Sequence, residues 1–593
     1  MMIGRRTRRV AGSLLALSLF AASCGGNTDN ANGGDSEPTV SAPAATDSTE
    51  ADTSETGTIE TERDASPVGD DETANEVVEE VVVDDLDPVA GGTLRMALEA
   101  ETAALNPTAS ALTGAGLNMA NAVFDTLVAV GEDGEPVPYL AESIEPVDGD
   151  LTRWRLRLRP DIVFHDGTQL DAAAVKANFD TQFASPLVGR ALQPFFPAEG
   201  AITVVDDLTV DYQVLDPDAA FPNQLHTQLG MMASPTWLAA VAEDPTLNQA
   251  PVGTGPFVFD SREEDSVTRF VRNDGWWGGE VYLDAVEFLP VPDPSTRNDL
   301  AFNGDVEMIQ TVDPASAIDL LDDEELQSVL DETGEENFVM LNAAVPPFDD
   351  RRVRQALAFA TPLQNVRDLI GLGVARPADQ MFTPDQPYFN PDVVQEGDDP
   401  DRALELVAEY CADVPEQCSD GKVNIDFSFG GGSVADARQA EILDQGWSVA
   451  FNVNFNELVQ DALVLSVATG QYQVTTWRQF GGIDPIATRQ NLLCRTVTEG
   501  ISLNFARLCS EPRDALIIQA QATTDLDARI ELWQGVVQDM QDSYSYIFMR
   551  HSPWVIAFEP DVRGVCERTN PEGVPLRCVS SGRTWFDSTW IVQ

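Results

Sequence analysis

The 593-residue chain has few of the residues that catalytic sites commonly use. Its three histidines, His165, His226 and His551, lie far apart in the sequence, and it has no G-x-S-x-G, H-E-x-x-H or phosphate-binding loop motif. Acidic pairs such as Asp349-Asp350 are too common in so acidic a chain to indicate the two carboxylates of a glycosidase. A secreted hydrolase is therefore the least favoured hypothesis, and we expect His165 to be a turn or core residue.

Basic residues are also scarce. The chain has 35 Lys and Arg against 98 Asp and Glu, a formal net charge of -63, and its lysines are Lys176 and Lys422 alone. A nucleic-acid-binding protein needs a basic face, so this composition excludes that class. After the N-terminal region no apolar run is long and unbroken enough for a transmembrane helix, which needs about 20 residues.

Cysteine is absent between Cys24 and Cys411. Six cysteines follow: Cys411, Cys418, Cys494, Cys509, Cys566 and Cys578. In an oxidising compartment an even number suggests disulfides, whose connectivity the count leaves open. Proximity in the sequence favours Cys411–Cys418, Cys494–Cys509 and Cys566–Cys578. A metal cluster is the alternative, but the spacings are not paired C-x-x-C and no histidine lies near them, so we expect no metal site.

Residues 1–23 have the pattern of an export signal. Four arginines between residues 5 and 9 precede an apolar run over residues 10–22, which is too short to span a bilayer. Residues 21–24, Ala-Ala-Ser-Cys, resemble the lipobox of bacterial lipoproteins, although Ala21 stands where leucine is usual. We expect Cys24 to become the first mature residue and to carry lipid. Ordinary signal cleavage, with Cys24 left as a free thiol, is the alternative.

Residues 24–90 are predicted to be the lipidated cysteine and a disordered acidic tether. From residue 25 to residue 90 the chain holds 19 Asp and Glu against one basic residue, Arg63, with no hydrophobic period. Such a composition cannot bury enough apolar surface to offset chain entropy, and its like charges repel one another.

The remaining chain mixes strand and helix patterns. Residues 151–159 alternate, with Trp154, Leu156 and Leu158 on one face and arginines on the other, as in a half-buried strand. Apolar runs over residues 202–205 and 208–214 flank Asp206-Asp207 and predict a hairpin. Helical spacing predicts helices over residues 171–179, 349–360, 399–410 and 525–540. This mixture, without a short repeat, predicts an α/β architecture.

An ordered set of short strings carries a family resemblance. The set includes residues 91–95 (GGTLR), 105–107 (LNP), 124–128 (FDTLV), 137–143 (VPYLAES), 156–160 (LRLRP), 164–168 (FHDGT), 251–257 (PVGTGPF), 347–356 (PFDDRRVRQA) and 562–564 (VRG). Each string alone is weak, but together they closely resemble the family 5 extracellular solute-binding proteins of bacterial ABC importers, the oligopeptide- and dipeptide-binding type. The resemblance runs from about residue 91 to about residue 564.

The resemblance implies a class II periplasmic-binding-protein fold, with two α/β lobes, an extra subdomain and a hinge. Lobe 1 would comprise residues 91–127 and 251–341, its extra subdomain residues 128–250, lobe 2 residues 342–543, and the return to lobe 1 with a C-terminal tail residues 544–593. Members of the family enclose a ligand between the lobes, and ligand favours closure through its better contacts in the closed form.

The resemblance also suggests ligand contacts. In peptide-binding relatives an aspartate of lobe 2 pairs with the peptide amino terminus, and Asp484 is the matching candidate here; an Asp-Pro turn with Pro485 is the alternative. The other candidates are Trp477, Arg478 and Phe480 from the same loop, and Asn106 and Asn118 from the segment after the first strand. Trp477 would stack on the ligand or lie in the core, and Arg478 would hold a ligand carboxylate or be solvated. Met549 and Arg550 are weaker candidates.

These features predict a lipid-anchored solute-binding protein on the outer face of the cytoplasmic membrane. It would capture a small solute as a monomer, without a cofactor, metal or catalytic residue, and deliver it to an ABC permease and ATPase complex. The resemblance makes an oligopeptide or dipeptide the default ligand, while sugars, haem and, with so few histidines, less readily nickel complexes remain open. A ligand-sensing surface receptor on the same scaffold is the alternative function, because a scaffold does not fix a function.

Overall fold

The computed structural model describes residues 86–593, apart from residues 103, 111, 332–334, 432–433 and 483. The predicted export signal, Cys24 and nearly all of the predicted tether lie outside the described residues. Within the described part of the chain, no helix combines the length and the apolar character that a membrane crossing requires.

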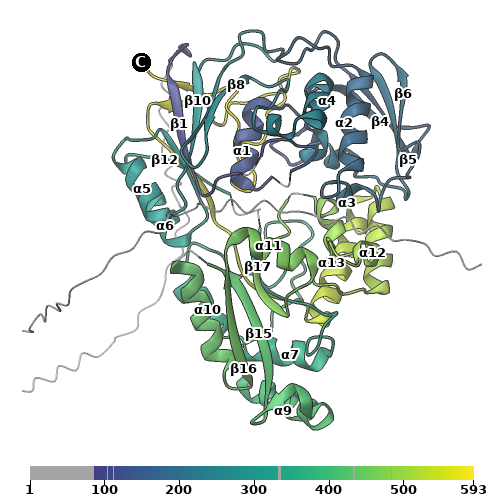
Figure 1. Ribbon diagram of the computed structural model, residues 1–593, viewed down its shortest axis with the longest axis vertical. Helices are drawn as coiled ribbons and strands as arrows, with labels where there is room; N and C mark the ends of the chain where they lie inside the picture. The colour runs from purple at the N-terminus through teal and green to yellow at the C-terminus, as the bar shows by residue number, and fades with distance from the viewer. Residues whose placement is uncertain (1–85, 103, 111, 332–334, 432–433, 483) are drawn as a thin grey trace, which may run out of the picture. The chain divides into compact units, whose positions relative to one another are not determined.

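Lobe 1 is built on a seven-stranded sheet (Figure 1). Its strands, in spatial order, are β12 (Gln327–Asp331), β19 (Trp554–Phe558), β11 (Met308–Thr311), β1 (Thr93–Leu98), β10 (Ala285–Pro290), β9 (Val267–Arg272) and β8 (Phe257–Glu263). Leu94 and Met96 of β1 pack with residues of α1 (Gly114–Val123), while Ala97 packs with α5 (Pro294–Phe302) and α6 (Pro314–Leu321). Because both faces of β1 are covered, its sequence is nearly continuously apolar.

The extra subdomain carries a four-stranded antiparallel sheet. Its strands, in order, are β4 (Ala141–Val147), β5 (Asp150–Leu158), β7 (Thr209–Gln213) and β6 (Ile202–Asp206); around them lie α2 (Ala172–Ala184), α3 (Gly189–Leu192), α4 (Pro235–Glu243), the pair β2 (Val128–Val130) and β3 (Pro136–Pro138), and 3-10 turns η1 (Phe221–Gln224), η2 (Gln228–Gly230) and η3 (Pro245–Gln249). The predicted alternation of β5 is confirmed, with Trp154, Leu156 and Leu158 buried. Arg155 on the other face binds Asp211 of β7 at 2.7 Å. The predicted hairpin over residues 202–214 is β6 and β7.

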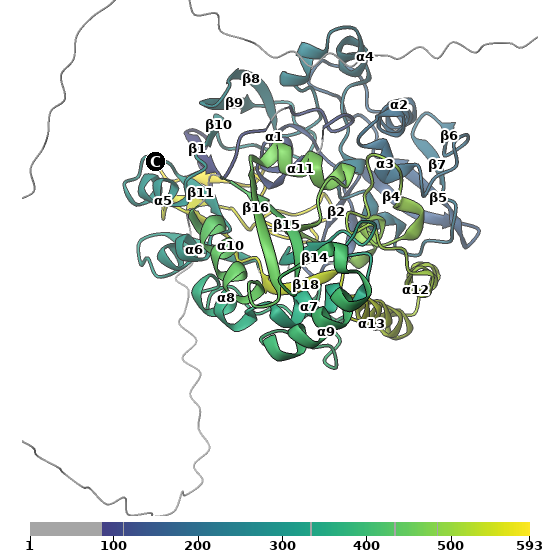
Figure 2. The ribbon, with the colours of Figure 1, turned by 60° about the horizontal axis from the view of Figure 1, so that its bottom comes forward.

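Lobe 2 holds the second large sheet. Its strands, in order, are β14 (Cys418–Ser419), β15 (Lys422–Gly430), β17 (Val474–Gln479), β13 (Glu336–Leu341) and β18 (Tyr546–His551), with β16 (Phe451–Leu458) paired to β15. Its helices are α7 (Arg351–Ala360), α8 (Leu363–Leu369), α9 (Pro400–Asp413), α10 (Val434–Trp447), α11 (Gln460–Thr469), α12 (Glu511–Ala522) and α13 (Leu526–Ser543), with 3-10 turns η4 (Pro415–Gln417), η5 (Pro485–Asn491) and η6 (Cys494–Thr496). Figure 2 shows α7, α8, α9 and α10 grouped around β15, β16 and β18. The helices predicted over residues 171–179, 349–360, 399–410 and 525–540 are present as α2, α7, α9 and α13.

The two faces of β13 belong to different cores. Val339 and Leu341 pack with α7, α8, α9 and α10. Phe338 and Met340, on the opposite face, lie in a cluster that contains Trp533 of α13 and continues into the subdomain core. The subdomain therefore shares one apolar core with lobe 2, although sequence order connects it to lobe 1.

The chain passes between the two large sheets at two adjacent places. It leaves β12 for β13 between Asp331 and Glu336, and it returns from β18 to β19 through Ser552 and Pro553. Both β13 and β18 pair within the lobe 2 sheet, so this sheet includes strands on the lobe 1 side of the expected boundaries at residues 341/342 and 543/544. The crossings lie just before β13 and just after β18, because the residues of both strands belong to the sheet and core of lobe 2.

Capping side chains explain why several of the helices begin where they do. Asp293, Asp313 and Asp399 each precede a proline, and each side chain accepts a hydrogen bond from the backbone amide three residues later. An aspartate at the N-cap satisfies an otherwise unpaired amide, and proline suits the first helical position. Part of the acidic excess therefore lies at helix starts.

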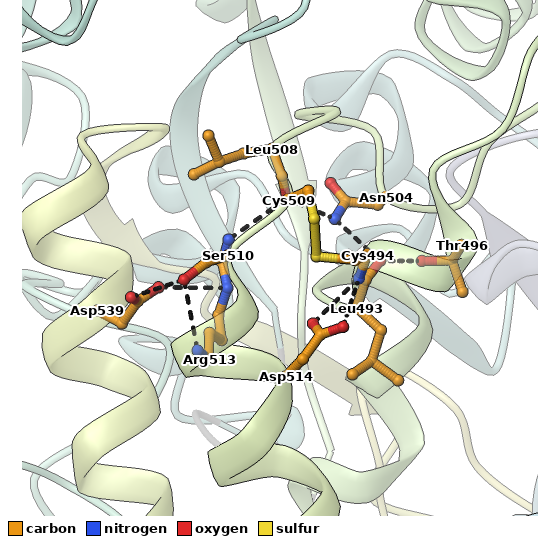
Figure 3. Close-up of a disulfide and its surroundings, with 10 residues drawn as sticks. All are labelled: Leu493, Cys494, Thr496, Asn504, Leu508, Cys509, Ser510, Arg513, Asp514 and Asp539. Atoms are coloured by element: carbon orange, nitrogen blue, oxygen red, sulfur yellow. Dashed lines mark hydrogen bonds and ion pairs between the residues drawn. A yellow bond between two sulfur atoms is a disulfide. The ribbon is translucent and has the colours of Figure 1, made fainter.

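Three disulfides are present among the described residues, and they join the pairs that sequence proximity favours. They are Cys411–Cys418, Cys494–Cys509 and Cys566–Cys578. Figure 3 shows Cys494–Cys509 beside the start of α12, where Asp514 accepts a hydrogen bond from the backbone amide of Cys494 at 3.0 Å and Ser510 donates to Asp539 at 2.8 Å. This bond fixes the segment between η5 and α12, which passes beside the subdomain.

A buried titratable pair lies where the crossings meet the lobe 2 sheet. Glu336 of β13 faces His551 of β18, with Oε1 and Nδ1 at 3.3 Å. Burial lowers the pKa of His551 from 6.5 to about 4, while burial and the charge of Glu335 raise the pKa of Glu336 well above 4.5. Both shifts disfavour the charged forms, so the folded pair favours a protonated Glu336 and an uncharged His551.

This pair predicts a specific dependence of stability on pH. Above the ordinary glutamate pKa the unfolded chain loses the proton that the folded Glu336 keeps, so this group lowers the free energy of unfolding as pH rises, until the folded Glu336 ionises. In Glu336→Gln this loss disappears. The stability of the variant relative to wild type should therefore rise by about 1.4 kcal/mol per pH unit from the ordinary glutamate pKa upward. Urea denaturation across a pH series measures this, with the exposed Glu405→Gln as control. A pH-independent difference would contradict the assignment.

Candidate functional site

Arg478 of β17 lies where charged groups of both lobes meet. Its Nη2 is 3.3 Å from Oε1 of Glu99, which follows β1 in lobe 1, and its Nε is 2.8 Å from Oε2 of Glu335 in the first crossing. Its guanidinium carbon lies 5.0 Å from the ring centre of Trp554, which starts β19. The side chain nevertheless remains 35% exposed, so it keeps surface for a further partner.

The electrostatics around Arg478 are balanced by several acids. Burial would lower the pKa of Arg478, but the negative charges of Glu335 and Glu99 outweigh it and raise that pKa. Burial raises the pKa of Glu335, while the positive charge of Arg478 opposes that shift. On lobe 2, burial lowers the pKa of Arg550 to about 10 and raises the pKa of Asp436, and each opposes the shift of the other. The region between the lobes therefore offers both cationic and anionic groups.

Several buried polar atoms near the crossings have no hydrogen-bond partner within the described residues. They are Oε1 of Gln310 at the end of β11, Oγ of Ser552 and Nε of Arg550. Buried polar groups are almost always paired, with protein, ordered water or a ligand. These three atoms therefore offer sites for further polar partners near the crossings.

Trp477 and Phe480, also predicted as ligand contacts, have different environments. Trp477 is partly buried and packs edge-on against Phe505, with ring centres 5.7 Å apart. Phe480 is buried among aromatic rings, with centres 5.3 Å from Phe338 and 5.2 Å from Tyr546. Its backbone φ of +80° turns the chain so that the side chain enters the lobe 2 core. Of the two, Trp477 keeps an accessible surface.

Asp484 is fully engaged by protein groups. Nη2 of Arg529 on α13 lies 2.6 Å from each carboxylate oxygen, Asn223 of the subdomain donates to Oδ2 at 3.1 Å, and the amide of Ile486 donates to Oδ1 at 2.8 Å. The side chain is 11% exposed. Asp484 therefore acts as the Asp-Pro cap of η5 and as a link to the subdomain, and its charge is already neutralised.

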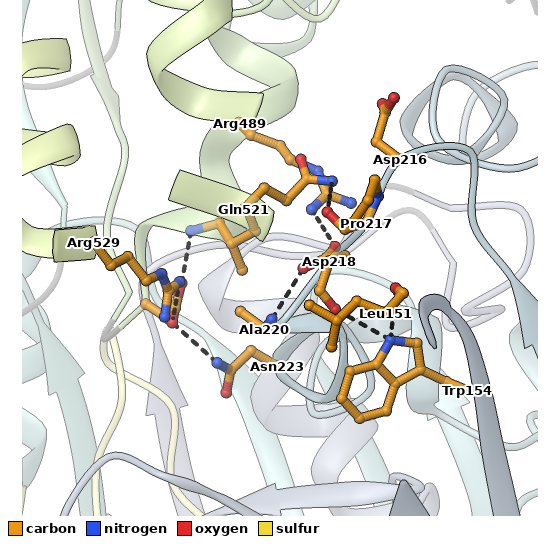
Figure 4. Close-up of polar contacts among 12 residues, drawn as sticks. Leu151, Trp154, Asp216, Pro217, Asp218, Ala220, Asn223, Arg489, Gln521 and Arg529 are labelled. Carbon is orange, nitrogen blue, oxygen red and sulfur yellow. Dashed lines mark hydrogen bonds and ion pairs between the residues drawn. The ribbon is translucent and has the colours of Figure 1, made fainter. Parts of the chain in front are cut away.

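Two ion pairs extend this contact between the subdomain and lobe 2. Asp218 pairs with Arg489 of η5 at 2.5 Å, with side chains 0% and 3% exposed (Figure 4). Asp216 pairs with Arg495 at 2.5 Å. Both guanidinium groups also lie over the ring of Phe195, at 4.3 and 4.7 Å. The lobes are thus joined at the crossings and again through the subdomain.

Asn106 and Asn118, the candidate ligand contacts in lobe 1, make hydrogen bonds to other segments of the protein. Asn106 is buried, donates to Asn248 at 2.8 Å and accepts from the amide of Thr108 at 2.9 Å. Asn118 on α1 is buried, donates to the carbonyl of Gly582 at 2.9 Å and accepts from the amide of Thr584 at 2.9 Å. The sequence alone does not indicate that the C-terminal segment contacts Asn118.

The structure brings into the site several residues that sequence analysis missed. They are Glu99, Gln310, Glu335 and Trp554. No local signal marks them as a set, although Glu99 and Glu335 each stand at the end of an apolar strand pattern. Among the described residues no group of three or more His, Cys, Asp or Glu could hold a metal ion.

Two surface hollows, of about 410 and 360 Å³, lie elsewhere on lobe 2. The first is lined by residues beside Cys509 and the starts and ends of α12 and α13, and the second by amide side chains of β15 and β16. Neither hollow is lined by Arg478 or by the crossings, so neither coincides with the region where buried polar atoms lack hydrogen-bond partners.

The contact through the subdomain makes a prediction about stability. Asp218→Asn leaves the buried Arg489 without a counter-charge, so the free energy of unfolding should fall by about 3–5 kcal/mol. Asp216→Asn is the matched control, because its pair with Arg495 is 29% exposed on each side and should contribute about 1 kcal/mol or less. Urea denaturation measures both. Equal losses would show that burial does not distinguish the two pairs.

Comparison with known proteins agrees with this architecture. The model of the bacterial extracellular solute-binding proteins, family 5 Middle, matches residues 135–497, which is more than half of the chain. The dipeptide-binding protein of Escherichia coli (strain K12) is 24% identical over 448 residues, covering 72% of this chain and 82% of that protein.

Two solved structures show the same fold. The ABC transporter-associated periplasmic binding protein DppA from Helicobacter pylori, in complex with the peptide STSA, has a TM-score of 0.74 and 19% identity, covering 85% of this chain and 99% of that one. NikA from Brucella suis, in complex with Fe(III)-EDTA, has a TM-score of 0.67 and 21% identity, covering 84% and 100%. The two-lobe α/β fold and the matched family model lead to one conclusion: this chain belongs to the family 5 bacterial extracellular solute-binding proteins.

Proposed function

We propose that this protein captures a small zwitterionic solute, an oligopeptide or dipeptide, between its two lobes and delivers it to an ABC permease. The observation that carries the proposal is the meeting of Arg478, Glu99 and Glu335 beside buried polar atoms that lack partners. A peptide has a carboxylate for a guanidinium and an amine for a carboxylate, and its backbone supplies further donors and acceptors.

The relatives support a peptide ligand without deciding it. The Escherichia coli relative is described as a dipeptide-binding protein, and the Helicobacter pylori structure holds a peptide. NikA, on the same fold, holds Fe(III)-EDTA. The scaffold therefore accepts different solutes, and the groups at the site must select among them.

In this proposal Asp484 does not bind the amine of the ligand. That carboxylate is bound on both oxygens by Arg529, so removing it from the arginine would expose an unpaired buried charge. Glu99 and Glu335, whose partner Arg478 is accessible, are the better acids for a ligand amine. Trp477 would supply an apolar surface beside them.

Binding would act on the two adjacent crossings. In this proposal the lobes turn relative to each other where the chain crosses between their sheets, at Glu335 before β13 and at Ser552 and Pro553 between β18 and β19. A solute that contacts Glu99 on lobe 1 and Arg478 on lobe 2 gains both contacts only when the lobes are together, and this difference favours the closed form. A permease would then distinguish loaded from empty protein. In the alternative, a surface receptor, the same closure would be passed to a signalling partner.

Calorimetry with a peptide pool tests the site. Peptides that co-purify with the protein from its native host are identified by mass spectrometry and titrated into wild type and Arg478→Met. The variant keeps the bulk of the side chain but loses a charge-assisted hydrogen bond to the carboxylate, which predicts about a tenfold or greater loss of affinity. Arg402→Met on α9, where Arg402 pairs with the exposed Glu405, is the control. Unchanged binding by Arg478→Met would refute the site, and the absence of any peptide affinity in wild type would refute the ligand class.

We also propose that Cys24 carries the lipid anchor and that the acidic segment after it is the tether. Two or more acyl chains give lasting membrane attachment, whereas one gives marginal binding. In the native host, Cys24→Ser should move the protein from the membrane to the soluble fraction, and the N-terminal peptide of wild type should carry the mass of acyl groups. Ser23→Ala, which leaves the cysteine in place, should remain membrane-bound. A wild-type protein with an unmodified Cys24 would contradict the anchor.

A further inference from the structure

The C-terminal tail after β20 (Val562–Arg563) ends in a tight hairpin before it returns as β21 (Trp590–Ile591). Ser580 and Arg583 exchange backbone hydrogen bonds of 3.0 and 3.1 Å across a two-residue turn. Both turn residues have positive φ, +50° at Ser581 and +70° at Gly582. This is the geometry of a type I′ turn, whose twist matches that of the flanking chain. Cys566–Cys578 ties the base of the tail together.

The hairpin, defined here as residues 580–583, is inserted into lobe 1 beside the first crossing. The carbonyl of Gly582 accepts from Asn118 of α1 at 2.9 Å and from Gln310 of β11 at 2.8 Å. The amide of Ser581 donates to Asp331 at the end of β12 at 2.6 Å. Three elements of lobe 1 therefore hold the turn in one position, and Gln310 is one of the residues whose second polar atom lacks a partner.

The same turn contacts the aromatic ring next to Arg478. A Cβ at Gly582 would lie 2.2 Å from the ring of Trp554, so the glycine backbone is pressed against the indole. Arg478 of lobe 2 lies over that indole at 5.0 Å. Trp554 thus touches the tail hairpin and the lobe 2 arginine, and the hairpin forms part of the surface at the proposed site.

The hairpin places one charged residue, Arg583, beside the proposed site. Its Nε and Nη2 donate to the carbonyl and hydroxyl oxygens of Ser580, at 2.9 and 3.0 Å, and these bonds orient the guanidinium. Burial lowers the pKa of Arg583, while the negative charges of Asp331 and Glu335 oppose that shift. Arg583 therefore lies within the field of Glu335, which binds Arg478. Unlike Arg478, its hydrogen bonds go to neutral oxygens, so its charge is less compensated.

From these contacts we propose that the tail hairpin is part of the solute-binding site and that Arg583 is a specificity-determining residue, which binds the carboxylate of the solute. The inference rests on the proposed function, because it adds a residue to the same site. The tail lies outside residues 135–497, which the family model matches. Arg478 and Arg583 would then both bind the solute carboxylate, and Arg583 would set the preference for an anionic group.

The test compares peptide acids with peptide amides. Wild type is incubated with an equimolar pool of dipeptides and tripeptides, and with the same pool as C-terminal amides; retained peptides are identified by mass spectrometry and titrated by calorimetry. We expect wild type to prefer acids. Arg583→Met should weaken binding of the acid about tenfold or more and leave the amide nearly unchanged, because the lost interaction involves the carboxylate alone. Arg583→Lys, which keeps the charge, should restore part of the preference.

Two controls separate this inference from the proposed function. Arg563→Met on β20 removes a tail arginine that donates to the backbone of its own strand, and it should bind like wild type. Thermal unfolding of each variant shows whether the tail remains folded. If wild type binds acids but Arg583→Met keeps the wild-type ratio of acid to amide affinity, the role of Arg583 is refuted and the proposed function stands. If wild type binds neither pool, both are refuted.

Discussion

The structure depends on two neighbouring chain crossings between its large sheets. Because β13 and β18 pair with strands of lobe 2 while β12 and β19 pair with strands of lobe 1, each crossing carries its end residues into the space between the lobes. Glu335, Ser552 and Trp554 owe their positions to this topology. Arg478 reaches the same place from β17, and Glu99 from the carboxyl end of β1. Ligand sites of open α/β sheets form at such strand ends.

The second connection between the lobes has a different character. The subdomain shares an apolar core with lobe 2 and is linked to it by two carboxylate–arginine pairs, Asp216–Arg495 and Asp218–Arg489, and by the hydrogen bond from Asn223 to Asp484. Buried ion pairs contribute little net stability, since desolvation offsets their attraction, but they are costly to break singly. Such a contact specifies one arrangement of the subdomain without adding greatly to the stability of the whole.

The tail shows how the last residues of the chain become part of lobe 1. Gly582 fits against Trp554 because it has no side chain, and Asn118 and Gln310 fix its carbonyl from two elements. The hairpin therefore contributes to lobe 1 as firmly as an internal loop does.

Local patterns in the sequence determined much of the fold. The alternation of β5, the starts of α5, α6 and α9 at Asp-Pro steps, and the three disulfides between neighbouring cysteines all depend on residues close together in the chain. Asp484-Pro485 repeats that Asp-Pro pattern, so its role as a cap was visible in the sequence. The ordered strings were enough to indicate the family.

Only the tertiary structure decided which charges meet. Arg529 lies on a helix well beyond Asp484, Glu99 and Arg478 come from different lobes, and Gly582 reaches Asn118 from the far end of the chain. The sequence determined where strands, helices and caps form, because backbone geometry and hydrophobic periodicity act over a few residues. The site was decided by the pairing order of strands and the burial of distant segments against one another, which no local period records.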